Sequence, residues 1–265
     1  MSALDDAFAR CRAEKRPAFI PFLMGGDPDM ETTGELLSAL ARGGADVIEL
    51  GVPFSDPIAD GPVNQRAAYR ALGAGAKLSS ILGLIAAKRD ELGVPVVLFT
   101  YFNQIHARGV ARFAEQAATS GVDGVLCVDL PPEEGAAEFT PALAEHGVDA
   151  VYLLSPTSTK KRIDLVGKAS SGFVYYVSRT GVTGERTALP ADLVREVKKV
   201  RRRCGLPVAV GFGISSPEQV AEVGGIADGV VVGSALVRMV EEGGKDPELP
   251  GRIEERVREL TALIR

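Results

Sequence analysis

The segment Val47–Pro62, VIELGVPFSDPIADGP, contains an apolar run followed by a polar loop. The run Val47–Leu50 is apolar except for Glu49, and nearly continuous apolar strands are typical of a parallel sheet that is covered on both faces. The loop that follows holds Pro53 and Pro57, and each proline fixes one backbone torsion angle. The segment therefore predicts a strand of a parallel sheet that leads into a loop of restricted freedom.

Similar apolar runs alternate with helical patterns over the whole chain. The eight strand candidates are Phe19–Met24, Val47–Leu50, Val96–Thr100, Gly124–Val128, Ala150–Leu154, Phe173–Val177, Val208–Gly211 and Gly229–Val232. Eight alternating units in 265 residues predict a single α/β domain with the closed (β/α)8, or TIM, barrel fold, for which about 250 residues is typical. An open doubly wound sheet is the alternative fold, but no GxGxxG sequence follows the first strand candidate.

A helix before the first strand and an insertion after the second extend the predicted barrel. Ser2–Asp5 has the pattern of a capping box, and Val63–Leu72 is a helix-like segment within an unusually long connection. Asp27–Pro28 has the composition of a helix start. No linker or low-complexity segment divides the chain, so we expect one domain over residues 1–265.

The composition disfavours several classes of protein. Hydrophobic residues make up 46% and charged residues 25%, as in soluble globular proteins. The net charge of −5 disfavours nucleic acid or an anionic membrane as the partner. No apolar run approaches the roughly 18 residues of a membrane span, and no signal-peptide pattern is present, so we expect a cytoplasmic protein. Cys11, Cys127 and Cys204 form no CxxC pair, and we expect neither a disulfide framework nor a metal site.

Three carboxylates lie at the predicted mouth of the barrel, where TIM-barrel enzymes place their active sites. Glu49 alternates with Ile48 and Leu50, so it faces the barrel interior if these two face the helices. Burial is expected to raise the pKa of Glu49 and to make it a proton donor or acceptor near neutral pH. Asp56 and Asp60 follow on the loop, within reach of the barrel mouth. The alternatives are a structural glutamate and two turn aspartates.

Glycine-rich segments follow the sixth, seventh and eighth strand candidates. The last two contain Gly211, Gly213, Gly233 and Ser234. Loops after these strands bind phosphate in many TIM barrels, because glycine lets the backbone approach the anion and a helix N-terminus favours negative charge. We therefore predict a phosphate site here. Ser178–Leu189 is long, polar and glycine-containing, which is the profile of a lid.

Six segments resemble the tryptophan synthase α subunit family. They are PFLMGGDP (Pro21–Pro28), ELGVPFSDPIADGPVNQRA (Glu49–Ala67), DGVLCVDLPPEE (Asp123–Glu134), LLSPTST (Leu153–Thr159), SRTGVTGERTALP (Ser178–Pro190) and PVAVGFGIS (Pro207–Ser215). The resemblance is collinear over nearly the whole chain, and the second segment alone is a highly specific signature. It implies a TIM-barrel lyase of tryptophan biosynthesis.

The resemblance also implies roles for individual residues. Glu49 and Asp60 match the two catalytic carboxylates, and Asp56 matches a position that communicates with a partner subunit. The positions that match the phosphate cradle are Gly184, Gly213, Gly233 and Ser234, and Gly211 belongs to the same group of strand ends. The positions that match the wall of the indole pocket are Phe22, Thr100, Leu126, Tyr175 and Phe212, and Thr183 matches a lid residue that contacts the second carboxylate.

The implied reaction is the retro-aldol cleavage of indole-3-glycerol phosphate to indole and glyceraldehyde 3-phosphate. Indole would pass to a β subunit that holds pyridoxal phosphate, in an α2β2 assembly, and no cofactor is expected in this chain. One departure is Gln104, where many members have proline in a segment that resembles the β-facing surface. The alternatives are a stand-alone lyase that releases free indole, a non-catalytic barrel, and another phosphate-binding barrel such as a sugar-phosphate isomerase.

Overall fold

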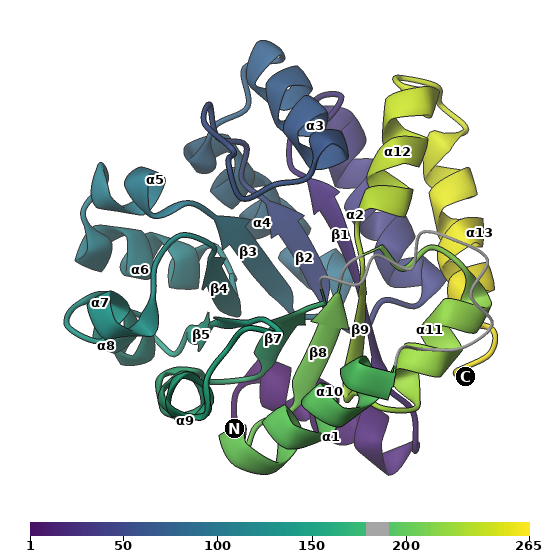
Figure 1. Ribbon diagram of the computed structural model, residues 1–265. Coiled ribbons are helices and arrows are strands. Elements are labelled where there is room, and N and C mark those ends of the chain that lie inside the picture. Colours follow the sequence, from purple (N-terminus) through teal and green to yellow (C-terminus); the bar gives the residue numbers. More distant parts are fainter. Residues whose placement is uncertain (179–190, 212) are drawn as a thin grey trace.

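Nine parallel strands form one sheet in the part of the chain that the structure describes, which is residues 1–178, 191–211 and 213–265. The structure is a computed structural model (Figure 1). The strands are β1 (Ala18–Met24), β2 (Ile48–Gly51), β3 (Val96–Thr100), β4 (Gly124–Cys127), β5 (Asp149–Val151), β6 (Leu153–Leu154), β7 (Val174–Val177), β8 (Val208–Gly211) and β9 (Gly229–Val232). Their order in the sheet is β5-β4-β3-β2-β1-β9-β8-β7-β6.

The two strands at the ends of this order are joined directly through the chain. β5 pairs with β4, β6 pairs with β7, and only Tyr152 separates β5 from β6. The sheet therefore curves into a barrel. The sequence predicted one strand over Ala150–Leu154, and this is wrong in detail: the two halves of the segment pair with different neighbours, so it forms two short strands. Together they take the place of one strand, and the predicted (β/α)8 barrel is confirmed.

Helices follow the strands and surround the barrel (Figure 1). They are α1 (Ala3–Ala13), α2 (Met30–Gly43), α3 (Pro62–Gly73), α4 (Leu78–Leu92), α5 (Phe102–His106), α6 (Val110–Thr119), α7 (Pro132–Gly135), α8 (Phe139–Glu145), α9 (Lys160–Ala169), α10 (Ala191–Cys204), α11 (Pro217–Gly224), α12 (Ser234–Gly243) and α13 (Leu249–Thr261). The predicted helical insertion after the second strand is α3, and it stands directly before α4.

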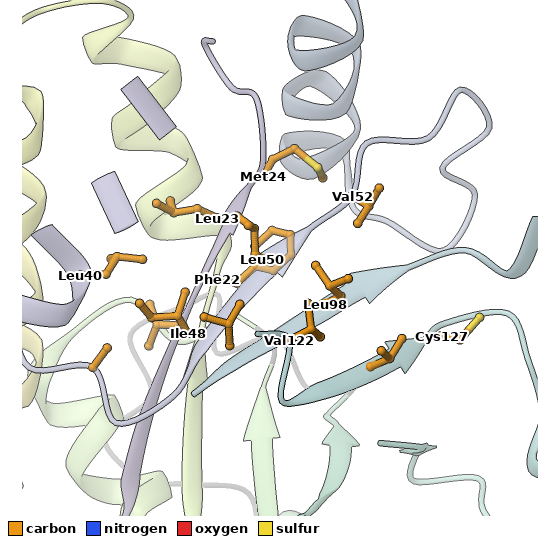
Figure 2. Close-up of a cluster of buried hydrophobic side chains, with 14 of the residues drawn as sticks. Phe22, Leu23, Met24, Leu40, Ile48, Leu50, Val52, Leu98, Val122 and Cys127 are labelled. Carbon is orange, nitrogen blue, oxygen red and sulfur yellow. The ribbon is translucent and has the colours of Figure 1, made fainter. Parts of the chain in front are cut away.

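Strand side chains divide between two apolar layers. Ile48 and Leu50 pack in the larger layer, between the barrel and the helices, and a smaller cluster fills the barrel interior. Figure 2 shows part of the larger layer, where Leu23, Leu50 and Leu98 come from β1, β2 and β3. The predicted alternation along β2 is confirmed, and it turns Glu49 towards the interior of the barrel.

Helix α1 covers the amino-terminal end of the barrel. The Ser2 side chain accepts a hydrogen bond from the Asp5 N–H, and the Asp5 carboxylate accepts one from the Ser2 N–H at 3.0 Å, so the predicted capping box is confirmed. Leu4 and Phe8 belong to the interior cluster, and the Phe8 ring centroid lies 5.3 Å from that of Phe173. Apolar side chains therefore fill this end of the barrel interior. The cavity described below lies at the opposite end, at the carboxyl ends of the strands.

One predicted helix start is wrong. Helix α2 begins at Met30, and its N-cap is Asp29, whose side chain accepts a hydrogen bond from the Thr32 N–H at 2.8 Å. Asp27 is instead buried and paired with Arg70 of α3. The composition of the segment indicated a helix start, but it could not show which aspartate is held by a cation from a distant helix.

Candidate active site

A cavity of about 340 Å³ opens at the carboxyl ends of the strands. Its wall combines two carboxylates, apolar strand residues and the amino-terminal turns of α3 and α12. The lining residues are Phe22, Glu49, Ala59, Asp60, Gly61, Pro62, Val63, Asn64, Phe99, Val128, Leu153, Tyr175, Val177, Gly213, Val231, Gly233, Ser234 and Arg238. The structure thus brings together, from distant parts of the chain, the predicted residues Phe22, Glu49, Asp60, Tyr175, Gly213, Gly233 and Ser234.

Glu49 is a buried carboxyl that has one unpartnered oxygen within the described part of the chain. It lies on β2 and is 2% exposed. Within the described residues, its Oε1 atom has no hydrogen-bond partner. Burial raises the pKa of Glu49 to about 8, with the charge of Asp60 as a second, smaller cause. A carboxyl with this pKa is mostly protonated at pH 7, and it can both give and take a proton near neutrality.

Asp60 is the opposite case, because its carboxylate has partners. The Tyr101 hydroxyl donates to Asp60 Oδ2 at 2.8 Å and accepts the Ala59 N–H at 3.1 Å. The ring of Phe54 stacks on that of Tyr101, with the centroids 5.0 Å apart. Burial raises the pKa of Asp60, while hydrogen bonds from Tyr101 and Asn64 oppose that rise by stabilising the ionised form. The net direction of the Asp60 pKa is upward, because burial is the larger effect, and the two donors are the groups that stabilise a negative charge on Asp60.

The first turn of α3 holds the loop that carries Asp60. Gln65 Nε2 donates to the Asp60 carbonyl at 2.9 Å and to the Pro57 carbonyl at 3.3 Å. Pro62 is the first residue of the helix, where its missing N–H costs no hydrogen bond. Asn64 lines the cavity, and its buried Oδ1 has no hydrogen-bond partner among the described residues. An amide oxygen in this position can accept a hydrogen bond from a ligand.

The amino-terminus of α12 forms another part of the wall. Gly233 is its N-cap and Ser234 its first residue. The first N–H groups of a helix have no partner within the helix, and the helix dipole favours an anion there. Gly213, with φ at 73°, lies in the same wall. Arg238, one turn further along α12, is the cationic side chain of the described wall. These groups suit a phosphate.

Aromatic and aliphatic side chains line the rest of the cavity. The Phe22 and Phe99 ring centroids lie 5.3 Å apart at an interplanar angle of 71°. Gly211 is outside the wall, but it makes room for a wall residue: a Cβ at this position would lie 2.3 Å from the Tyr175 hydroxyl oxygen. An apolar cavity with a few polar groups is the usual form of a small-molecule site.

The remaining predicted residues lie elsewhere. Thr100 is fully buried outside the wall, and Leu126 packs in the interior cluster. Asp56 is exposed on the loop, close in the chain to Ile58, whose side chain is also exposed. Thr183, Gly184 and Phe212 lie outside the described residues, as does the predicted lid beyond Ser178.

Sequence reasoning missed other wall residues. Strand alternation places Val177 on the same side as Tyr175, so parity counting along each strand could have found it. Asn64, Arg238 and the Asp60 partner Tyr101 carried no comparable signal, because their positions depend on how helices and loops pack against the barrel.

Other kinds of site have little support in the described part of the chain. No group of three or more His, Cys, Asp or Glu side chains there could hold a metal ion. The three cysteines are buried and free. Among the same residues, no single helix is long and apolar enough to cross a membrane, and α3 and α4 meet that criterion only as a pair bent by 91°.

Comparison with known proteins gives a consistent result at the level of sequence. A family model described as "Tryptophan synthase alpha chain" matches residues 8–264. The tryptophan synthase alpha chain of Geotalea daltonii is 49% identical over 247 residues, which cover 93% of each chain. That of Citrifermentans bemidjiense is 52% identical over 242 residues, covering 91% of this chain and 90% of the relative.

Solved structures of tryptophan synthases are also similar to this chain. Tryptophan synthase subunit alpha from Legionella pneumophila superposes with a TM-score of 0.92 at 34% identity, covering 100% of this chain and 98% of the other. A structure of the tryptophan synthase α2β2 complex from Pyrococcus furiosus gives a TM-score of 0.87 at 41% identity, covering 92% and 98%. The alternation of strands and helices, the cavity with its two carboxylates, and these matches lead to one conclusion: the chain belongs to the tryptophan synthase alpha chain family.

Proposed function

We propose that the chain is the alpha subunit of a tryptophan synthase and that it cleaves indole-3-glycerol phosphate to indole and glyceraldehyde 3-phosphate. One observation carries the proposal. A single cavity holds a buried carboxyl, Glu49, a second carboxylate, Asp60, and the amino-terminus of α12, with apolar walls around them. This combination fits a substrate with an aromatic ring at one end and a phosphate at the other.

The substrate has a defined orientation in this cavity. Its phosphate binds the backbone N–H groups near Gly213, Gly233 and Ser234, where glycine and the helix dipole favour an anion. Its indole ring lies among apolar residues such as Phe22 and Tyr175. The indole N–H then points to the loop that carries the second carboxylate.

The reaction breaks the bond between indole C3 and the glycerol chain. C3 gains a proton, and the hydroxyl on the neighbouring carbon loses one as it becomes the aldehyde oxygen. The electron pair of the broken bond stays on C3 and restores the aromatic ring. Between these events the indole nitrogen is positively charged, and the ionised Asp60 stabilises that charge.

Glu49 performs the proton transfers. With a pKa of about 8, it is protonated for much of the time at pH 7 and gives its proton to C3. The carboxylate that results takes the proton of the hydroxyl, so Glu49 returns to its starting state at the end of the reaction. No proton is gained or lost overall.

An assay of indole-3-glycerol phosphate cleavage tests the proposal, with the wild-type chain and Asp60→Asn. The substitution keeps the shape of the side chain and removes its charge, so kcat should fall by about 100-fold to 1,000-fold, while glycerol 3-phosphate binds as before. A wild-type chain without cleavage activity would refute the proposed function. A variant within threefold of the wild-type rate would return Asp60 to the role of a turn residue.

We further propose a β subunit with pyridoxal phosphate as the partner, in an α2β2 assembly that passes indole between the subunits. The Pyrococcus furiosus relative is described in such a complex, and the loop with Asp56 and Ile58 offers an exposed surface here. Adding the β subunit should strongly stimulate cleavage. A rate that does not change on this addition favours the stand-alone lyase.

Two expectations on organisation belong to the same proposal. One barrel domain spanning residues 1–265 is supported by the family match over residues 8–264. A cytoplasmic location fits the composition, and fractionation of the native host would test it.

A further inference from the structure

Four charged side chains link three elements next to the cavity. Arg70 of α3 donates two hydrogen bonds to the carboxylate of Asp27, in the segment after β1, at 2.8 and 2.7 Å. The same guanidinium donates to Glu241 of α12 at 2.8 Å. Arg66, one turn earlier on α3, donates to both carboxylate oxygens of Glu241 at 2.7 and 2.8 Å. We call these four residues the clamp.

Each helix places its first turn on the cavity and its later turns on the clamp. On α12, the wall residue Ser234 and the clamp residue Glu241 are seven positions apart, which puts them on one helix face. On α3, the wall residue Val63 is followed by Arg66 and Arg70 at the third and seventh positions. Figure 1 shows α3 and α12 near each other at the barrel mouth, so the clamp lies directly behind the two helix ends that line the site.

The clamp is built on a buried charge. The Asp27 side chain is 2% exposed, whereas that of Glu241 is 26% exposed. A buried carboxylate needs its cation, because removing one partner of a buried pair leaves an uncompensated charge. Asp27 therefore fixes the orientation of Arg70 through Nε and Nη2, and Nη1 is directed at Glu241 of α12. None of the four residues lines the cavity, so the clamp acts only through the elements it joins.

We propose that the clamp sets the distance between the phosphate cradle on α12 and the loop that carries Asp60 before α3, and that Arg70 and Glu241 are positioning residues for cleavage. This inference rests on the proposed function, because it requires a substrate held at both ends. Such a substrate reacts at full rate only while its two anchors keep their spacing, and a misplacement of 1 Å can cost about 100-fold in rate.

The consequence differs between two substrates. Indole-3-glycerol phosphate is anchored by its phosphate and by its ring, so its rate of cleavage depends on the spacing between α12 and α3. Indoleglycerol, which lacks the phosphate, is anchored by its ring alone, and its slower cleavage should not depend on where α12 lies. A role of the clamp in folding alone would affect both substrates equally or neither of them.

The test uses Glu241→Ala in the full chain, assayed with the β subunit present. We expect kcat for indole-3-glycerol phosphate to fall by about tenfold or more. Glycerol 3-phosphate should bind within twofold of wild type, because the backbone N–H groups of the cradle remain. The kcat/KM for indoleglycerol should stay unchanged. Glu241→Gln should fall between Glu241→Ala and wild type, since its amide oxygen still accepts a hydrogen bond from arginine.

Glu254→Ala is the matched control. Glu254 of α13 accepts hydrogen bonds from Arg42 of α2 at 2.8 Å and from Arg258, and its side chain is 16% exposed. It thus joins two helices by a similar ion pair, but it lies outside the cavity wall. Both alanine variants should lower the melting temperature by a similar small amount, and only Glu241→Ala should change the kinetics.

Three results would overturn the inference: an unchanged kcat in Glu241→Ala, an equal loss with both substrates, or a large loss of glycerol 3-phosphate binding. A wild-type chain that cleaves neither substrate would instead refute the proposed function.

Discussion

Replacing Glu49 with glutamine should make the protein more stable relative to wild type as the pH rises. The pKa of Glu49 is raised from its ordinary value of 4.5 to about 8 in the folded protein, first by burial and second by the charge of Asp60. Between these two pH values the folded protein keeps a proton that the unfolded chain releases. The stability that Glu49 contributes is therefore complete below about pH 4.5, decreases as the pH rises, and is lost as the pH passes through about 8.

The size of the effect follows from these two pKa values. Each pH unit in this range lowers the free energy of unfolding by about 1.4 kcal/mol. Integrated between pH 5 and pH 9, the loss is roughly 4 kcal/mol, because titration is only partial near the two ends of the range. This is a large fraction of the 5–15 kcal/mol or so that stabilises a typical domain. Glutamine has no such titration, so the variant should escape this loss.

Urea unfolding of both proteins at pH 5, 7 and 9 measures the effect. The other titrating groups are common to the two proteins, so the difference between their free energies of unfolding isolates Glu49. Glu35→Gln, at an exposed position on α2, serves as the control and should follow the wild type at every pH. The same Glu49→Gln variant should lose nearly all cleavage activity. Parallel pH curves for wild type and Glu49→Gln would refute the reasoning, because they would mean that Glu49 ionises at its ordinary pH.

Two further substitutions test how the site is supported. Tyr101→Phe removes the hydroxyl that donates to Asp60 at 2.8 Å but keeps the ring. The kcat should therefore fall by about tenfold or more, while glycerol 3-phosphate binding stays unchanged. A wild-type kcat in this variant would show that Asp60 does not need Tyr101. Gly211→Ala places a Cβ 2.3 Å from the Tyr175 hydroxyl oxygen, so kcat/KM should fall by about tenfold or more because the cavity wall must shift. Gly83→Ala on α4, where a Cβ meets nothing within 4 Å, is its control, and equal kinetics for the two glycine variants would contradict the predicted clash.

The fold was predictable because its signals are local. The strand candidates Val96–Thr100, Val208–Gly211 and Gly229–Val232 agree with β3, β8 and β9 at both ends, since a buried parallel strand is a short apolar run with clear boundaries. The orientation of Glu49 followed from alternation along β2. The division of Ala150–Leu154 into β5 and β6 could not be predicted from alternation, because it depends on which strand each half of the segment pairs with.

The supports of the site could not be predicted in the same way. Tyr101 and Asp60 are 41 positions apart, and Arg70 and Glu241 are 171 positions apart. No spacing rule relates such residues, because their contact depends on the packing of whole elements around the barrel. The family resemblance pointed to the groups that we propose meet the substrate, and it left open what keeps those groups in place.

The two carboxylates differ in their surroundings more than in their location, and this difference suits the proposed chemistry. Cleavage needs one group that carries a proton at neutral pH and one that carries a charge. Glu49 lacks a partner for Oε1 among the described residues, so burial acts unopposed and keeps its proton on. Asp60 is also buried in part, but Tyr101 and Asn64 stabilise its ionised form. The instability that Glu49 brings at high pH therefore has a use in the proposed reaction. A hydrogen-bond donor placed at Oε1 would stabilise the protein, and it would remove the acid that we propose for the protonation of C3.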